Sequence, residues 1–207
     1  MTVARDERAA LLASMRAVGP DAPTLCAGWT VRDLAAHLLA RENRIDYLPG
    51  IAIARFSNRT ERIQADIRAY ANWQAMLTRL STGPPAYSPF KWLDSVASIH
   101  EMFVHHEDIR RVADGWTPRE MSVPAQRALR RVTMVMSRVV LPRLPAQVTL
   151  RTRDLSVVSK IGRGPRVMVT ADVGELLLFV FGRTQINADF EGDADTVDAI
   201  TRAKRRV

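Results

Sequence analysis

The sequence predicts an α+β protein, in which an N-terminal bundle of antiparallel helices precedes a small C-terminal α/β domain. Up to about residue 140, apolar residues recur every three or four positions in long segments separated by breaker-rich loops, a pattern typical of helical bundles. Beyond Pro145 the period changes to the alternation of strands. We therefore expect two domains, 1–144 and 145–207.

Five helices are expected in the first domain, four forming a bundle and one added to it. Gly19-Pro20 ends the first helix, and Pro142 follows the last. Thr30 stands three residues before Asp33, which is the arrangement of an N-cap with an acidic residue in the first turn of the second helix. The expected ranges are 4–18, 30–48, 59–80, 91–112 and 122–140.

The C-terminal domain combines short strands with two helices. Asp172, with Glu175 three residues later, is expected to cap an apolar helix over 174–181 that Gly182 closes. A second helix is expected over 195–204. Strands are expected over 147–153, 156–161, 166–170 and 186–190.

Composition favours a soluble globular protein. Of the 207 residues, 47% are hydrophobic and 25% are charged, and no apolar run approaches the roughly 20 residues that a membrane helix needs. The single cysteine, Cys26, excludes an internal disulfide, and the charged N-terminus does not continue into the apolar segment of a signal peptide. We therefore expect a cytoplasmic protein without a membrane partner.

The net charge of +8 raises the question of nucleic-acid binding. Three of the 30 basic residues are lysines, and the arginines are spread along the chain rather than gathered in a recognisable binding motif. The one concentrated basic run, Arg202 to Arg206, ends the last expected helix, where cations are favourable. Nucleic acid is therefore not the expected partner.

Histidines are the most informative residues for chemistry. Glu101 and His105 are four residues apart, so on a helix both side chains point the same way. His37 lies between Leu34 and Leu38 on the inward side of the second helix. If the two helices are neighbours, two imidazoles and one carboxylate converge inside the bundle.

Such a trio fits a catalytic metal site, in which three protein ligands leave one position open for water or substrate. Zinc is the preferred metal, although the same donors suit non-haem iron(II) or nickel. The alternative is that His37 and His105 are buried histidines that bond Glu101 or Asp108 without a metal. The spacing leaves both interpretations open.

Four other residues near these positions have weaker indications. His106 is expected to support the ligands from outside or to face the surface. Asp108 either orients an imidazole or pairs with Arg111. We expect Trp29 to pack at the start of the second helix, and Cys26 to be structural because no base is evident beside it.

Arg183 follows the helix-closing Gly182. One interpretation is a cation at a helix C-terminus. The other is a substrate contact that binds an anionic carboxylate in a cleft between the domains.

Two segments carry a resemblance to a known family. Ala27-Gly-Trp-Thr-Val-Arg-Asp-Leu-Ala-Ala-His37-Leu and Glu101-Met-Phe-Val-His105-His106-Glu-Asp-Ile-Arg-Arg111 resemble the signature segments of the DinB-like superfamily. They are most similar to its actinobacterial branch of mycothiol-dependent maleylpyruvate isomerase-like proteins. The resemblance implies that His37, Glu101 and His105 are the metal ligands. Residues 174–183 and 190–193 are similar to that family's small C-terminal domain, which is related to sterol-carrier-like folds.

The resemblance implies a metal-dependent, thiol-using enzyme, an isomerase or an S-transferase. A metal, most suitably zinc, would bind a low-molecular-weight thiol such as mycothiol and activate it as a thiolate. The expected partners are this thiol and a small electrophilic substrate. The alternative is a metal-binding protein of the same fold without turnover.

Overall fold

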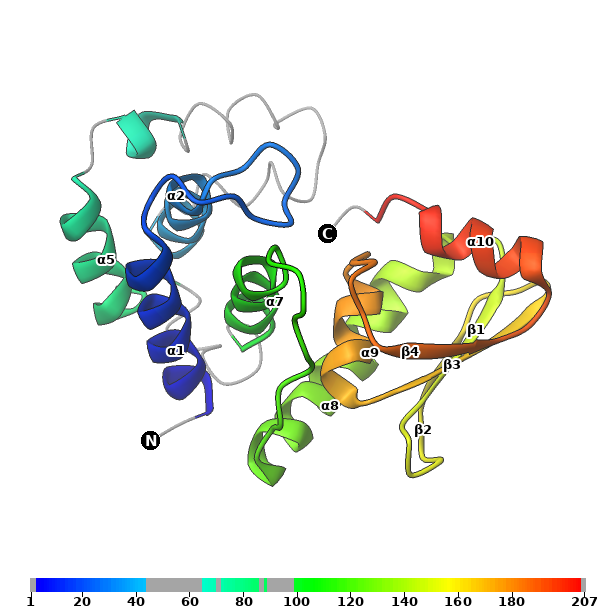
Figure 1. The fold of residues 1–207 in the computed structure, drawn as a ribbon. Helices are drawn as coiled ribbons and strands as arrows, with labels where there is room; N and C mark the ends of the chain where they lie inside the picture. The colour runs from blue at the N-terminus through cyan, green and yellow to red at the C-terminus, as the bar shows by residue number, and fades with distance from the viewer. Residues whose placement is uncertain (1–2, 44–64, 70–71, 86–87, 89–98, 206–207) are drawn as a thin grey trace. The chain divides into compact units, whose positions relative to one another are not determined.

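A computed structural model describes residues 3–43, 65–69, 72–85, 88 and 99–205, and every structural statement below concerns these residues. They divide into two compact units, Met1–Trp116 and Thr117–Val207. Helices make up the first unit, and a four-stranded mixed sheet with helices makes up most of the second. The predicted α+β class is confirmed (Figure 1).

The first unit is a helical bundle. Its helices are α1 (Val3–Val18), α2 (Val31–Asn43), α5 (Trp73–Thr82) and α7 (Ile99–Arg110). Helix α1 packs against both α7 and α5, and α2 packs against α5 (Figure 1). Leucine, methionine, alanine and valine side chains from all four helices fill the core, among them Leu11, Leu34, Leu77 and Met102.

Helix α2 begins with the cap that the sequence predicts. The Asp33 carboxylate accepts hydrogen bonds from the Thr30 amide at 2.9 Å and from the Thr30 hydroxyl at 2.7 Å. The Thr30 hydroxyl oxygen in turn accepts from the Asp33 amide at 3.3 Å. This reciprocal bonding satisfies amides that the first turn leaves without helical partners.

The single helix expected over 59–80 is wrong. Asn72 has an extended backbone, with φ −63° and ψ 139°, and its side chain accepts from the amides of Gln74 and Ala75 to cap α5. Apolar periodicity continues across Asn72, so the period alone hides the break. The parts of the expected helices at 44–48, 59–64 and 91–98 lie outside the described residues.

The second unit pairs helices with one face of a sheet. It begins with α8 (Val123–Val140) and the 3₁₀ turn η3 (Leu141–Arg143). The strands β1 (Gln147–Arg151), β2 (Val157–Ile161), β3 (Arg166–Ala171) and β4 (Ala188–Glu191) lie in the order β2-β1-β3-β4. Helix α9 (Val173–Val180) joins β3 to the segment before β4, and α10 (Ala194–Arg202) follows β4.

Strand β1 pairs parallel with β3, and the outer pairs β1–β2 and β3–β4 are antiparallel. Alternate residues of the two central strands are buried, including Val148, Leu150, Val167 and Val169. Helix α8 packs on α9 and β2, and α9 packs on β3. The predicted strands and helices of this part of the chain are therefore present.

The division after Trp116 places α8 with the sheet. The ranges predicted from the sequence, 1–144 and 145–207, follow the change from helical to strand periodicity instead, and they stay a prediction about the folding domains. Within the described residues, no helix is both long enough and apolar enough to cross a membrane.

Candidate metal centre

Helix α7 is buried along nearly its whole length, although it is rich in charged residues. Eleven of its twelve residues are buried. Six of these have titratable side chains, namely His100, Glu101, His105, His106, Glu107 and Asp108. Because an isolated buried charge is costly, each of these side chains is expected to have a partner.

The structure brings His37 of α2 together with Glu101 and His105 of α7. Glu101 Oε2 lies 3.8 Å from His37 Nε2 and 3.4 Å from His105 Nε2. The two imidazole rings meet edge to face, with their centroids 5.3 Å apart. One potential ligand atom from each residue lies within 4.8 Å of the other two, as a shared metal ion requires.

Asp108 holds the imidazole of His105 from the opposite side. Its Oδ2 lies 2.9 Å from His105 Nδ1, so His105 Nε2 faces Glu101. The Cys26 thiol donates to the same Asp108 oxygen at 3.2 Å, and the Leu25 amide donates to the Asp108 carbonyl at 2.9 Å. The loop before α2 is thus fastened to α7 beside the cluster.

These contacts create a second, overlapping group of potential ligands. Atoms of Cys26, His105 and Asp108 also lie within 4.8 Å of one another. Since His105 belongs to both groups, its two ring nitrogens face different sets of donors. Sequence reasoning missed this role of Cys26, because the path of the loop that brings the thiol to α7 leaves no periodic signal.

Arg41 is a second residue that sequence reasoning missed. Its guanidinium donates to Glu101 Oε1, and His100 Nε2 lies 3.3 Å from the same oxygen. Burial alone would raise the pKa of Glu101, but Arg41 and the surrounding histidines hold it well below its usual range. A signal was present, because Arg41 follows His37 by four residues and shares its face of the helix.

The two candidate imidazole ligands differ in their preference for a proton. Burial lowers the pKa of His37. Burial acts in the same direction on His105, but hydrogen bonds with Asp108, Cys26 and Glu101 outweigh it and raise the pKa of His105 well above its usual range. By themselves, these contacts favour the neutral imidazole at His37 and the imidazolium at His105.

His106 neither joins the cluster nor faces solvent. It is 4% exposed, and its Nδ1 lies 2.8 Å from Glu7 Oε1. Its Nε2 lies 2.9 Å from the Ser14 hydroxyl. His106 thus links α7 to α1, which corrects the expectation of a surface position.

Arg111 has an acidic partner on its own helix. Its Nε donates to Glu107 Oε2 at 2.5 Å, and its guanidinium lies 4.2 Å from the centroid of the Trp116 ring. Glu107 is therefore an acidic partner of Arg111. The geometry also supports the other expected role of Asp108, orienting an imidazole.

Two further predicted positions are described by the structure. Trp29 packs against the core of the first unit, with its ring centroid 5.2 Å from that of His37. In the second unit, Arg183 donates to the Phe181 carbonyl at 2.9 Å, the contact expected of a cation at the end of α9. The role of Arg183 as a substrate contact stays a prediction.

Comparisons with known proteins agree with the predicted family resemblance. Residues 2–48 match the family model described as "Mycothiol maleylpyruvate isomerase N-terminal domain". The resemblance is therefore confirmed. The matched segment contains His37 and Arg41 and ends before α7. No curated protein matches the chain.

Two solved structures share the fold. The crystal structure of the mycothiol-dependent maleylpyruvate isomerase matches with a TM-score of 0.58 and 14% identity, covering 91% of this chain and 90% of that one. A histidine-to-alanine mutant of that enzyme matches with a TM-score of 0.56 and 14% identity, over 90% of each chain. The chain thus has the fold of mycothiol-dependent maleylpyruvate isomerase, with a candidate metal site buried in its helical unit.

Proposed function

We propose that the protein is a metal-dependent enzyme that uses a low-molecular-weight thiol, with His37, Glu101 and His105 as the metal ligands. The observation that carries this proposal is the approach of their ligand atoms to within 4.8 Å of one another inside the bundle. Two imidazoles and one carboxylate form a set of three protein ligands, the number that catalytic zinc sites use to keep a position open. Zinc is therefore the metal that we expect.

The surrounding contacts fit this assignment. Asp108 engages His105 Nδ1, which leaves Nε2 for the metal; carboxylates commonly hold the far nitrogen of a metal-bound histidine in this way. Arg41 engages Glu101 Oε1, while Glu101 Oε2 faces the imidazoles. His105 and Glu101 are thus each held by a neighbour through an atom other than the proposed ligand atom.

The chain's own residues have distinct parts in this proposal. Arg41 keeps Glu101 ionised, and Asp108 fixes the ring of His105. Trp29 packs beside His37 and limits the orientations of its ring. The bound metal would supply acidity, lowering the pKa of a coordinated thiol so that it reacts as the thiolate.

We propose that the thiol is mycothiol and that its partner is a small electrophile, undergoing S-transfer or cis–trans isomerisation. The support is the likeness of fold to an enzyme described as mycothiol-dependent, together with the candidate ligands. The alternative is a protein that binds a metal without turnover, since one fold serves many functions. The two alternatives differ in their response to a thiol.

The decisive first experiment measures metal content in three forms of the chain. We expect near-stoichiometric zinc by elemental mass spectrometry in the unaltered protein and in Cys26→Ser, and its loss in His37→Ala. Both groups of potential ligands contain His105, but only one contains His37 and only the other contains Cys26. Zinc lost in Cys26→Ser but kept in His37→Ala would refute the proposed ligands.

The second step adds mycothiol to Cys26→Ser, which contains no protein thiol. Thiolate absorption that appears only in the zinc-loaded sample would support the enzyme and justify screening electrophiles. Zinc without thiolate formation would favour the protein without turnover. If neither His37→Ala nor the unaltered protein holds metal, the cluster is a histidine–carboxylate core and the proposal fails.

A further inference from the structure

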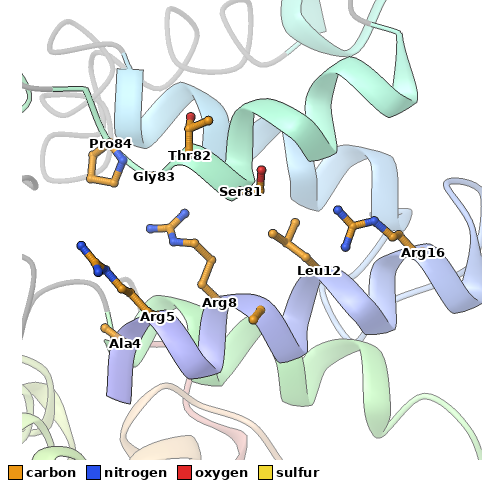
Figure 2. A pocket seen from close by; sticks show the side chains of 10 residues that line it. Ala4, Arg5, Arg8, Leu12, Arg16, Ser81, Thr82, Gly83 and Pro84 are labelled. Carbon is orange, nitrogen blue, oxygen red and sulfur yellow. The ribbon is translucent and has the colours of Figure 1, made fainter. Parts of the chain in front are cut away.

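A second site of the first unit lies between α1 and the end of α5. A cavity of about 390 Å³ is lined by six residues of α1 and by the four residues from Ser81 to Pro84. This volume is in the range of small-molecule pockets, roughly 300 to 1,000 Å³. Figure 2 shows Arg5 and Arg8 on the side of Thr82, Gly83 and Pro84, and Arg16 farther along α1, beyond Leu12.

The three arginines form one face of α1. Arg5, Arg8 and Arg16 follow the helical spacing, with Leu12 between the second and the third. None of the ten residues that line the cavity is acidic. The helix dipole favours Arg16 in the last turn of α1, but it does not explain Arg5 and Arg8, because cations are unfavourable near the N-terminus of a helix.

Arg8 is held in place by two hydrogen bonds, but its guanidinium keeps further N–H groups for a ligand. Its side chain is 10% exposed, and it donates to the Leu80 carbonyl at 3.0 Å and to Glu42. These bonds engage two of the five N–H groups of a guanidinium. A Cβ on Gly83, whose φ is +72°, would lie 4.0 Å from Arg8 Cζ, so the glycine leaves space in front of the guanidinium.

The other polar groups of the cavity restrict its ligand. The Ser81 hydroxyl donates to the Thr78 carbonyl and the Thr82 hydroxyl donates to the Arg79 carbonyl, each at 2.7 Å. Their protons are therefore engaged, and the arginines are the main source of N–H donors from the side chains. In the part of the chain that the structure describes, Arg5 and Arg16 form no ion pair.

We propose that this cavity binds a small molecule through a doubly charged oxyanion, either a phosphoryl group or a dicarboxylate. Glu42 balances one of the three guanidiniums, which leaves an excess of about two positive charges to match the ligand. Leu12 offers an apolar surface for the organic part of the molecule. The proposal is independent of the metal cluster, because none of the candidate metal ligands lines the cavity.

The test is calorimetric titration of the full chain with inorganic phosphate and with succinate. We expect saturable binding of at least one of them, weakened about tenfold or more in Arg5→Gln/Arg16→Gln because two of the positive charges that line the cavity are removed. The matched control is Arg127→Gln/Arg163→Gln, which removes the same charge from two other exposed arginines that form no ion pair among the described residues. The control is expected to bind like the unaltered protein.

Two further variants make the result specific. Ala9→Leu fills the cavity from α1 with a good helix former and leaves the charge unchanged, so it should also weaken binding. His37→Ala should bind as well as the unaltered protein, which separates this site from anion binding at a metal. Tighter binding of phosphate or of succinate identifies the class of ligand. No saturable binding, or equal losses in the two double variants, would overturn the proposal.

Discussion

Helices α7 and α9 are both buried, but they are buried by different means. Helix α7 buries eleven of its twelve residues, and six of them are titratable. Helix α9 buries all eight of its residues, and Glu175 is its one titratable side chain. Glu175 accepts a hydrogen bond from the Asn187 amide at 2.8 Å. One helix thus places titratable side chains in the interior, and the other supplies apolar packing.

The difference indicates that the buried charges of α7 are present for a reason other than stability. Replacing a buried ion pair with well-packed apolar residues is often neutral or stabilising, so the charges of α7 are not needed for a core as such. Helix α9 shows that this chain can bury a helix with apolar side chains. The polar face of α7 is therefore better explained by a site than by packing.

The largest effect is expected from His105→Ala, which removes the residue common to both groups of potential ligands. We expect stoichiometric metal binding to be abolished, as measured by elemental mass spectrometry on the folded protein. The matched control is His106→Gln on the same helix, which alters the link to Glu7 and Ser14 instead. Full metal content in His105→Ala would show that α7 does not supply the metal ligands, and the contrast between α7 and α9 would then need another explanation.

In α9 the corresponding change is Phe179→Ala, which should affect stability and spare the metal. Phe179 is 1% exposed, and its ring packs edge to face with Phe190 at 5.8 Å. Truncating a buried phenylalanine costs about 3–5 kcal/mol, which urea unfolding would measure. The control Val157→Ala, at a side chain 55% exposed, should change stability by less than about 0.5 kcal/mol. Metal lost from the folded fraction of Phe179→Ala would argue against separate roles for the two helices.

Asp108→Asn sharpens the comparison within α7, because it changes an orienting group rather than a ligand. The amide keeps an acceptor near His105 Nδ1 but loses the charge. Removing a carboxylate that holds a metal-bound histidine typically lowers metal affinity by about 10- to 100-fold, which competition with a chromophoric chelator would measure. Cys26→Ser should retain the unaltered affinity, since a hydroxyl can still donate to Asp108. Equal metal affinities in Asp108→Asn and the unaltered protein would show that the charge of Asp108 does not contribute to metal binding.

Sequence reasoning reached the candidate trio because its signals are local. Glu101 and His105 share a face through the helical repeat, and His37 is flanked by two leucines of the core. The approach of the two helices then brings the three side chains together. Their role as ligands stays a prediction, which the metal measurements above would test.

The missed features include a contact between distant residues and a local helix cap. Cys26 reaches Asp108 across 82 positions, because backbone hydrogen bonds fold the loop before α2 against α7. Asn72 ends a segment whose apolar period continues on both sides, so only its capping preference could have indicated the break. Periodicity predicts which face is buried, but it does not predict where a loop turns.

The smallest predicted effect concerns Asp33, a titratable residue that caps α2 outside the metal cluster. Burial alone would raise its pKa, but hydrogen bonds from Thr30 and the guanidinium of Arg68 lower the pKa below its usual value. A lowered carboxyl pKa stabilises the fold above the unfolded value of about 3.9, and this contribution is lost as the pH falls through the folded pKa. Asp33→Asn should therefore cost about 1 kcal/mol near neutral pH and progressively less in acid, as urea unfolding across that range would show. A cost that does not change with pH would assign the stabilisation to hydrogen bonding rather than to the charge of the carboxylate.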